Sequence, residues 1–429
     1  MPRLLITVKE NCEQIIAINN KMAKVSIIIF IALSSLELFN FSFLGSDLTK
    51  AFQMAGIAML FIILIVNVVY QKEVNFERHF NFEVFIILLG VFLSMFMAQW
   101  GHDQPIPTTL IAQRFMYFYL MYWVLHSIKP NVENIEKIIY WLGITFSVFY
   151  LIQFFLYPTV IFDVRIAPDR GTLRIFLTGF TFLVMAYFLT LNRLFDYFSV
   201  GKLFSLLFFI SILILMGTRQ VIFSVILLTL LNVLFSKKVK SKVLIVVLIS
   251  AAIFPVVILF QEIFLSLIEL SKTQTESLAE NVRIRATVFF LTELFPNTFS
   301  YFTGNGADST NSYYGMLIQM YRDAYGFYQS DIGIIGDYTR FGALFVLGAL
   351  MILFKIIFGK ISSHYTYIKF FFISVLLTLF TGGGPFAQAD SIVAICFTLY
   401  IIDVDKHEVK FFQEEELQEE EFEDARMLS

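Results

Sequence analysis

Apolar residues along this chain of 429 residues are grouped in runs separated by short polar connections. Many runs have the roughly 20 residues that let a helix cross the hydrocarbon core of a bilayer. The pattern predicts an all-α polytopic membrane protein with about 12 transmembrane helices. The predicted spans lie near residues 25–44, 51–70, 82–98, 110–127, 135–157, 173–191, 202–217, 219–235, 242–260, 331–354, 367–381 and 386–402.

One stretch of 70 residues, Gln261 to Ser330, interrupts this pattern. It is rich in charged residues and tyrosines, and Gly304-Asn305-Gly306 within it predicts a turn. We therefore expect a loop large enough to form a site. The predicted organisation is an N-terminus over 1–24, nine helices over 25–260, the large loop over 261–330, three helices over 331–402 and an acidic tail over 403–429.

Basic residues in the connections predict the orientation, because cytoplasmic connections are enriched in Lys and Arg. Sixteen lysines and four arginines fall on the side that holds both termini. Both termini are therefore expected in the cytoplasm, and the large loop is expected outside it. The composition agrees, since 58% hydrophobic residues, 15% charged residues and a mean hydropathy of +0.76 exclude an ordinary soluble domain.

The sequence shows no pattern typical of a disulfide or of a metal site. Cys12 precedes the first apolar run and Cys396 lies in the last one, so we expect no disulfide between them. The five histidines are scattered without the spacing of metal ligands. The sequence therefore predicts no cofactor and no metal, and it gives no indication of a nucleic-acid partner.

The basic residues assigned to the outer side are mostly arginine, with only Lys50 and Lys272 as lysines. A guanidinium group can bind a phosphate or a carboxylate through two parallel hydrogen bonds, which an ammonium group cannot do. Each arginine alone could equally pair with a nearby acid or a lipid headgroup. Together they favour an anionic ligand on the outer face. The candidate ligand-binding residues are Arg165, Arg170, Arg174, Arg219, Arg283, Arg285 and Arg322.

The residues around each group of these arginines predict the local structure that carries it. The connection 157–173 contains Pro158, Pro168 and Gly171, so we expect a shaped loop. Arg219 lies in a four-residue hairpin between two apolar runs and is expected at the membrane surface. Residues 275–295 predict a helix whose apolar stripe includes Arg285, while Arg283 points about 160° away. This periodicity predicts a buried Arg285 and a solvated Arg283, or one paired with Glu280.

Other charged residues near the apolar runs need partners as well. Asp337 and Arg340 are one helical turn apart, so an intrahelical ion pair is the default interpretation. Glu37 and Arg114 each need a partner within the helix bundle, which the sequence does not identify. Three acids, Asp331, Asp323 and Glu276, are candidates for a general base in or beside the large loop.

The order of these motifs resembles that of the O-antigen polymerases of the Wzy type and the related O-antigen ligases. The resemblance covers roughly residues 160–355 and rests on loose motifs. These are G-T-R-Q at 217–220, N-V-R-I-R-A-T-V-F-F at 281–290, the G-x-G turn, D-I-G-I-I-G at 331–336 and F-G-A-L at 341–344. It implies a GT-C-like architecture in the bacterial cytoplasmic (inner) membrane.

The resemblance also implies an activity: transfer of a glycan from undecaprenyl diphosphate to an acceptor sugar at the outer face, without nucleotide or metal. The expected partners are the undecaprenyl-diphosphate-linked oligosaccharide, membrane lipid and a chain-length regulator protein. Arg219 matches the hairpin arginine of the family, Arg283 or Arg285 its loop-helix arginine, and Asp331 its acidic residue before the glycines. Ligases typically carry a loop histidine, and this chain has none between His126 and His364. That difference favours a polymerase.

A flippase or secondary transporter of lipid-linked sugar is the alternative from another class, because twelve spans are ordinary for one. Transporters bind near the membrane midplane and are built from internal repeats. This sequence shows no such repeat, and a transporter gives no reason for an outer loop of 70 residues.

The predicted orientation can be tested by labelling single cysteines with an impermeant reagent. A cysteine placed at Ser309, in the large loop, should react from outside the cell, whereas one placed at Ser241 should not. Labelling of Ser241 in place of Ser309 would reverse the orientation and move the candidate site to the cytoplasmic face.

Overall fold

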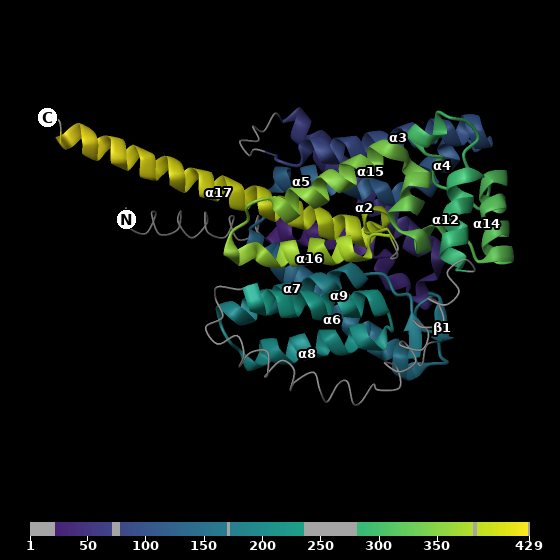
Figure 1. The fold of residues 1–429 in the computed structure, drawn as a ribbon, viewed down its shortest axis with the longest axis horizontal. Helices are drawn as coiled ribbons and strands as arrows, with labels where there is room; N and C mark the ends of the chain where they lie inside the picture. Colours follow the sequence, from purple (N-terminus) through teal and green to yellow (C-terminus); the bar gives the residue numbers. More distant parts are fainter. Residues whose placement is uncertain (1–21, 71–77, 170–171, 236–280, 381–383, 428–429) are drawn as a thin grey trace, which may run out of the picture.

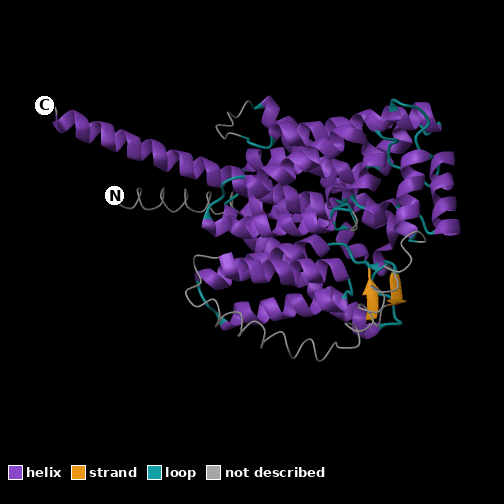
Figure 2. Cartoon of the chain, in the orientation of Figure 1, coloured by secondary structure: helices purple, strands orange, loops and turns teal. Residues whose placement is uncertain are grey.

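The computed structural model describes residues 22–70, 78–169, 172–235, 281–380 and 384–427. It is a bundle in which most helices run roughly along one direction, with a small two-stranded sheet at one end (Figures 1 and 2). The long helices are Met22–Ser35, α2 Gly45–Val69, α3 Asn81–His102, α6 Val132–Leu156, α7 Phe180–Asp196, α8 Val200–Leu215, α9 Arg219–Phe235, α15 Ile334–Phe358, α16 Thr366–Thr378 and α17 Ala389–Met427.

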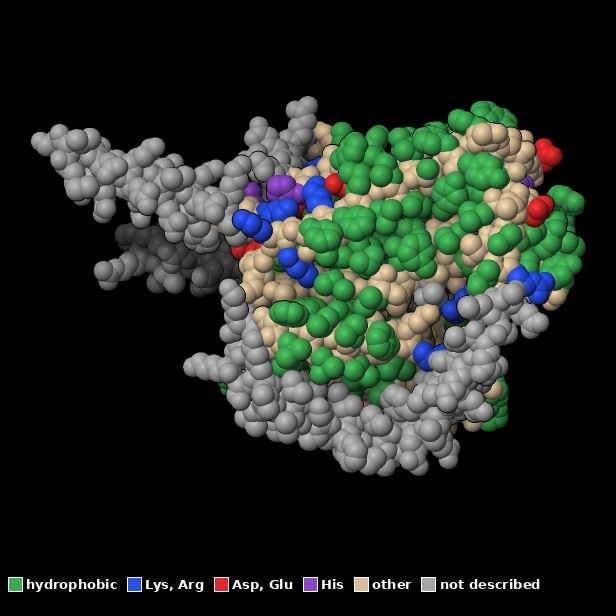
Figure 3. Space-filling view, viewed as in Figure 1, with side chains coloured by type: hydrophobic (Ala, Val, Ile, Leu, Met, Phe, Trp, Pro, Cys, Tyr) green, Lys and Arg blue, Asp and Glu red, His purple; other side chains and the backbone are tan. Residues whose placement is uncertain are grey.

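Four segments of this part of the chain are long and apolar enough to cross a membrane: Ser42–Val69, α3, α6 and α15. Figure 3 shows hydrophobic side chains across the middle of the visible face and charged side chains gathered toward its two ends. Both observations are consistent with the predicted all-α membrane protein, and the described chain is mostly helical. The expected number of twelve spans and the sidedness stay predictions, and the expected span 242–260 lies outside the described residues.

Two of the predicted spans are interrupted in the structure. The expected span 110–127 is divided into α4 (Ile106–Ala112), a 3₁₀ helix (Arg114–Leu120) and α5 (Met121–Ile128). The expected span 25–44 ends as a helix at Ser35 and continues into a turn of unusual shape, Glu37–Asn40. Both irregular segments contribute residues to the same cavity, which is described below.

Glu37–Asn40 is a left-handed turn of four residues other than glycine, with φ of 48°, 51°, 57° and 52°. This conformation costs about 1–2 kcal/mol per residue. Neighbouring segments hold it in place: the Thr178 hydroxyl donates to the Leu36 carbonyl at 2.9 Å, and the Asp163 N–H donates to the Asn40 carbonyl at 2.6 Å. The ring of Phe39 is buried and meets that of Phe149 edge to face, with centroids 4.9 Å apart.

The connection expected as a shaped loop forms a β-hairpin of β1 (Ile166–Asp169) and β2 (Thr172–Ile175). Strand β2 is tied to the end of α8. The Thr172 hydroxyl donates to the Leu215 carbonyl at 2.7 Å. The Tyr150 hydroxyl, from α6, donates to the Leu173 carbonyl at 3.0 Å. The hairpin is therefore held next to the connection between α8 and α9.

The described part of the large loop contains α12 (Val282–Thr292), α13 (Ser300–Thr303) and α14 (Tyr313–Tyr325), at the same end of the bundle as the hairpin (Figure 1). Its small core is built from one side of α12 and of α14, and consists of Ala286, Phe290, Leu294, Tyr314, Ile318, Phe327 and Ile332. Helix α17 leaves the bundle at the opposite end.

The predicted turn Gly304-Asn305-Gly306 is confirmed, and it docks on a break in α15. Gly342 has φ of 78° within that helix, so the carbonyls before it lose their helical partners. The N–H of Asn305 donates to the Thr339 carbonyl at 3.0 Å, and that of Gly306 to the Arg340 carbonyl at 2.7 Å. The turn therefore satisfies the groups that the break exposes and fixes the loop to the bundle.

Candidate functional site

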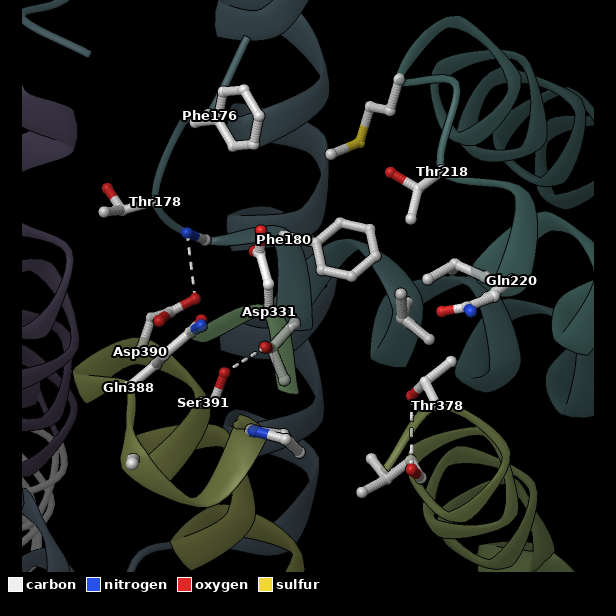
Figure 4. Close-up of a pocket in the computed structure, with 18 of the residues that line it drawn as sticks. Phe176, Thr178, Phe180, Thr218, Gln220, Asp331, Thr378, Gln388, Asp390 and Ser391 are labelled. Carbon is white, nitrogen blue, oxygen red and sulfur yellow. Dashed lines mark hydrogen bonds between the residues drawn. The ribbon is translucent and has the colours of Figure 1, made fainter. Parts of the chain in front are cut away.

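A cavity of about 1040 Å³ opens among the ends of four helices. It is lined by the N-terminal residues of α7, α9, α12 and α17, together with β2, the left-handed turn and the segment before α15. Figure 4 shows Thr218 and Gln220 of the α9 start on one side, and Gln388, Asp390 and Ser391 of the α17 start on the other. The predicted site residues Arg174, Arg219, Arg283 and Asp331 all line this cavity.

Each helix N-terminus carries a partial positive charge, because its first N–H groups have no partner within the helix. Acidic residues normally occupy this position and stabilise it by about 0.3–1 kcal/mol each. The first turns of α9 and α12 contain no acidic residue. Both contain an arginine that lines the cavity, Arg219 and Arg283. Two positive helix ends and two guanidinium groups therefore meet in one space.

Arg174 adds a third guanidinium group to this space. It lies on β2 opposite Ala167, and its guanidinium packs over the Phe176 ring with 4.8 Å to the centroid. The anchoring of β2 to α8 explains its place next to Arg219. The charges of Arg283 and Arg174 both act on Arg219 by Coulomb repulsion. All three arginines are partly buried, so solvent screens this repulsion only in part.

Arg219 is placed by the short connection that the sequence predicts as a hairpin. Gly217 adopts φ of 62°, and Thr218 then starts the helix by accepting hydrogen bonds from the N–H groups of Val221 and Ile222, each at 3.1 Å. Arg219 is therefore the first residue of α9. These backbone hydrogen bonds fix the position from which the Arg219 side chain extends.

Arg283 lies in the cavity, and Arg285 does not, which reverses the expectation from periodicity. Helix α12 starts at Val282, after Asn281, whose side chain accepts a hydrogen bond from the Arg283 N–H at 3.0 Å. The expected part of this helix before Asn281 lies outside the described residues. The buried face of α12 is made by Ala286 and Phe290. Arg285 is exposed, with its guanidinium 5.7 Å from the Phe327 ring centroid, so its predicted burial is wrong.

Asp390, which the sequence analysis missed, neutralises the other two helix ends. It lies in the first turn of α17, is 6% exposed, and accepts a hydrogen bond from the Gly179 N–H at the start of α7 at 3.0 Å. Thr181 and Ser391 hydrogen bond to each other beside it (Figure 4). The α7 and α17 ends therefore share a carboxylate, whereas the first turns of α9 and α12 contain no acidic residue. The sequence does contain a sign of this role, because Asp390 is an acidic residue near the start of the last predicted span.

Asp331 reaches the cavity from the 3₁₀ helix Gln329–Ile332, and it is exposed. Its backbone N–H donates to the Tyr328 carbonyl at 3.1 Å, which fixes the turn that carries it. Asp323 lies on an exposed position of α14 and does not line the cavity. Glu276 lies outside the described residues, as does Arg170. Asp331 is therefore the one member of the predicted acid set that the structure places beside the arginines.

Two further predicted arginines form a strip that starts at the cavity. Arg165 lies 5.3 Å from the Phe176 ring centroid and 5.7 Å from that of Tyr328. Arg322 lies 5.5 Å from the Tyr328 ring and 3.9 Å from the Asp308 carboxylate. Neither arginine lines the cavity, but Phe176 does. Alternating cations and rings therefore connect the cavity to α14.

The structure answers two of the pairing questions that the sequence raised. Glu37 and Arg114 find each other, with Oε1 and Nη2 3.5 Å apart, and both line the cavity. Arg340 donates to the Gln329 side chain at 2.9 Å. Asp337 is buried, and its Oδ2 has no hydrogen-bond partner within the described ranges. The charge of Arg340 acts on Asp337, as the expected intrahelical ion pair requires, but the Arg340 Nε donates to Gln329 instead.

The described residues contain no group of three or more His, Cys, Asp or Glu side chains that could hold a metal ion. The polar chemistry that they bring together is that of guanidinium groups, helix ends and carboxylates. Comparison with known proteins adds no assignment: no protein-family model matches the sequence, and no curated protein matches it.

The geometry predicts that Arg283, and not Arg285, binds a diphosphate. In the purified protein, Arg283→Lys should weaken the binding of inorganic pyrophosphate roughly tenfold or more, because a charge-assisted hydrogen bond is worth about 1.5–3 kcal/mol. Arg219→Lys should behave alike. Arg285→Lys, two residues along the same helix, is the matched control and should bind as the wild type does. Loss of binding in Arg285→Lys together with normal binding in Arg283→Lys would contradict this assignment.

Proposed function

We propose that this protein is a polysaccharide repeat-unit polymerase, which transfers a glycan from undecaprenyl diphosphate to an acceptor sugar of a second lipid-linked repeat unit. The observation that carries the proposal is the meeting of Arg174, Arg219 and Arg283 at the starts of α9 and α12, whose first turns contain no acidic residue. Such an arrangement suits a ligand with two or more negative charges. The resemblance of the motifs to Wzy-type polymerases supplies the class of substrate.

The reaction that we propose needs no activated cofactor, because the donor arrives with a diphosphate leaving group. The acceptor hydroxyl attacks the anomeric carbon, a new C–O bond forms, and the bond from that carbon to the diphosphate oxygen breaks. Arg174, Arg219 and Arg283 stabilise the negative charge that develops on the departing diphosphate. Asp331 takes the hydroxyl proton, since it is the carboxylate from the predicted acid set that lines the same cavity.

The setting of the enzyme follows from the same proposal. The protein lies in the bacterial cytoplasmic membrane with twelve spans and both termini in the cytoplasm, so the cavity faces outward, where no nucleotide is available. A chain-length regulator protein is its partner. The cavity volume of about 1040 Å³ suits a sugar diphosphate and part of an acceptor, because single-ligand pockets measure roughly 300–1,000 Å³.

Two other functions would use a related site. An O-antigen ligase performs the same bond exchange with a different acceptor. A flippase or transporter holds its ligand near the membrane midplane. Here the cavity lies among helix starts at the end of the bundle that carries α12 and the hairpin, which supports transfer rather than transport.

The test is an assay with purified protein in nanodiscs and undecaprenyl-diphosphate-linked repeat units extracted from cells that lack this protein. The wild type should lengthen the glycan and release undecaprenyl diphosphate without added nucleotide, and a chelator should have no effect. Asp331→Asn should lower kcat by roughly 10²–10⁴-fold, as expected for loss of a general base. Asp323→Asn, an exposed acid away from the cavity, is the matched control and should keep full activity.

Two results would contradict the polymerase, and a third would change only the assignment of its base. Joining of units only to a lipid A core acceptor would indicate a ligase. Movement of the lipid-linked sugar across a bilayer without joining would indicate a transporter. Equal activity of Asp331→Asn and the wild type would leave the polymerase in place and remove Asp331 as its base.

A further inference from the structure

A second group of polar side chains lines the cavity, and the diphosphate site does not use it. It consists of Glu37, Gln53 and Arg114, which come from the left-handed turn, α2 and the 3₁₀ helix Arg114–Leu120. These elements all precede the hairpin in the chain, whereas the diphosphate site is built from the hairpin, α9 and α12. The cavity therefore has two chemically different sets of polar residues.

The contacts of Arg114 show how this second group is arranged. Its Nε donates to Gln53 Oε1 at 2.6 Å, and its Nη1 donates to the Ile111 carbonyl at 3.3 Å. Only its Nη2 reaches Glu37, at 3.5 Å. Gln53 and Ile111 therefore hold the guanidinium group, and Glu37 receives one long hydrogen bond from it.

Glu37 consequently keeps most of its capacity to accept hydrogen bonds. A carboxylate offers about four lone-pair sites, and within the described ranges the Arg114 contact is the hydrogen bond that Glu37 receives. Its side chain is 23% exposed, and Glu37 lines the cavity. A partly buried carboxylate with free lone pairs suits a ligand rich in hydroxyl groups, since each hydroxyl can donate to it.

The conformation of the left-handed turn does not depend on the Glu37 side chain. The φ of 48° at Glu37 is one that glycine adopts without strain, so the turn itself does not require a glutamate. Strained residues that persist in a structure cluster at functional sites. The turn is held by contacts of Leu36, Phe39 and Asn40, and none of these uses the Glu37 side chain.

We propose that Glu37 and Arg114, with Gln53 holding the guanidinium, form the binding site for the acceptor sugar. The carboxylate accepts hydrogen bonds from sugar hydroxyls, and Arg114 donates to sugar oxygens. This proposal rests on the polymerase function above, because a polymerase must hold a donor diphosphate and an acceptor sugar together. It adds no covalent step: the acceptor proton still goes to Asp331.

Two glycine substitutions test the proposal. Glu37→Gly removes the carboxylate and relieves the backbone, and Asn40→Gly relieves the backbone in the same turn while keeping the carboxylate. Both variants should melt at or above the wild-type temperature, because glycine suits a positive φ. Two probes are used: undecaprenyl diphosphate, and the lipid-free repeat-unit oligosaccharide released by mild acid from the accumulated lipid-linked units.

Both variants should bind undecaprenyl diphosphate as the wild type does, and only Glu37→Gly should bind the oligosaccharide about tenfold or more weakly. Glu37→Gln, which keeps the size of the side chain, should weaken oligosaccharide binding in the same direction if Glu37→Gly does not fold. Normal oligosaccharide binding by the folded Glu37 variants would overturn the acceptor site, as would equal loss of both probes. Failure of the wild type to bind undecaprenyl diphosphate would instead overturn the polymerase function.

Discussion

The structure around the cavity depends on the electrostatics of helix starts. Four helices begin there, and each start presents N–H groups and a partial positive charge. Asp390 serves the starts of α7 and α17. At α9 and α12 the residues in that position are Arg219 and Arg283, which add to the charge instead of neutralising it. An anion in the space between them would therefore be stabilised by both helix starts and both guanidinium groups.

The irregular parts of the fold place side chains at this space. The hairpin is fixed to α6 and α8 by Tyr150 and Thr172, and this brings Arg174 beside Arg219. The break at Gly342 lets the Gly304–Gly306 turn dock on α15, which ties the large loop to the bundle. The left-handed turn places Glu37 in the same cavity. A straight bundle of regular helices would place none of these residues together.

Sequence reasoning predicted the membrane fold and much of the cavity, because both depend on local features. Apolar runs predict helices, and the short connection that holds Arg219 at the start of α9 is readable from four residues. The prediction for Arg285 is wrong because Ala286 and Phe290, and not Arg285, form the buried face of α12. The apolar stripe was therefore assigned to the wrong face, while contacts with α14 and the segment before α15 decide which face is buried.

The sequence could not identify contacts between residues far apart in the chain, and the reason is different. Glu37 and Arg114 are 77 positions apart, and Asp390 and Gly179 are 211 apart, so only the packing of helices decides that they meet. One sequence carries no information on such pairs unless a motif links them. The same holds for Asp331, whose place beside the arginines depends on the docking of the large loop.

The most direct test of the account is a cryo-electron microscopy structure of the protein in nanodiscs with undecaprenyl-diphosphate-linked repeat unit bound. The account predicts density for the diphosphate between the starts of α9 and α12, with phosphate oxygens within about 2.7–2.9 Å of the guanidinium groups of Arg174, Arg219 and Arg283. Diphosphate density elsewhere, with the cavity among these helix starts empty, would contradict it.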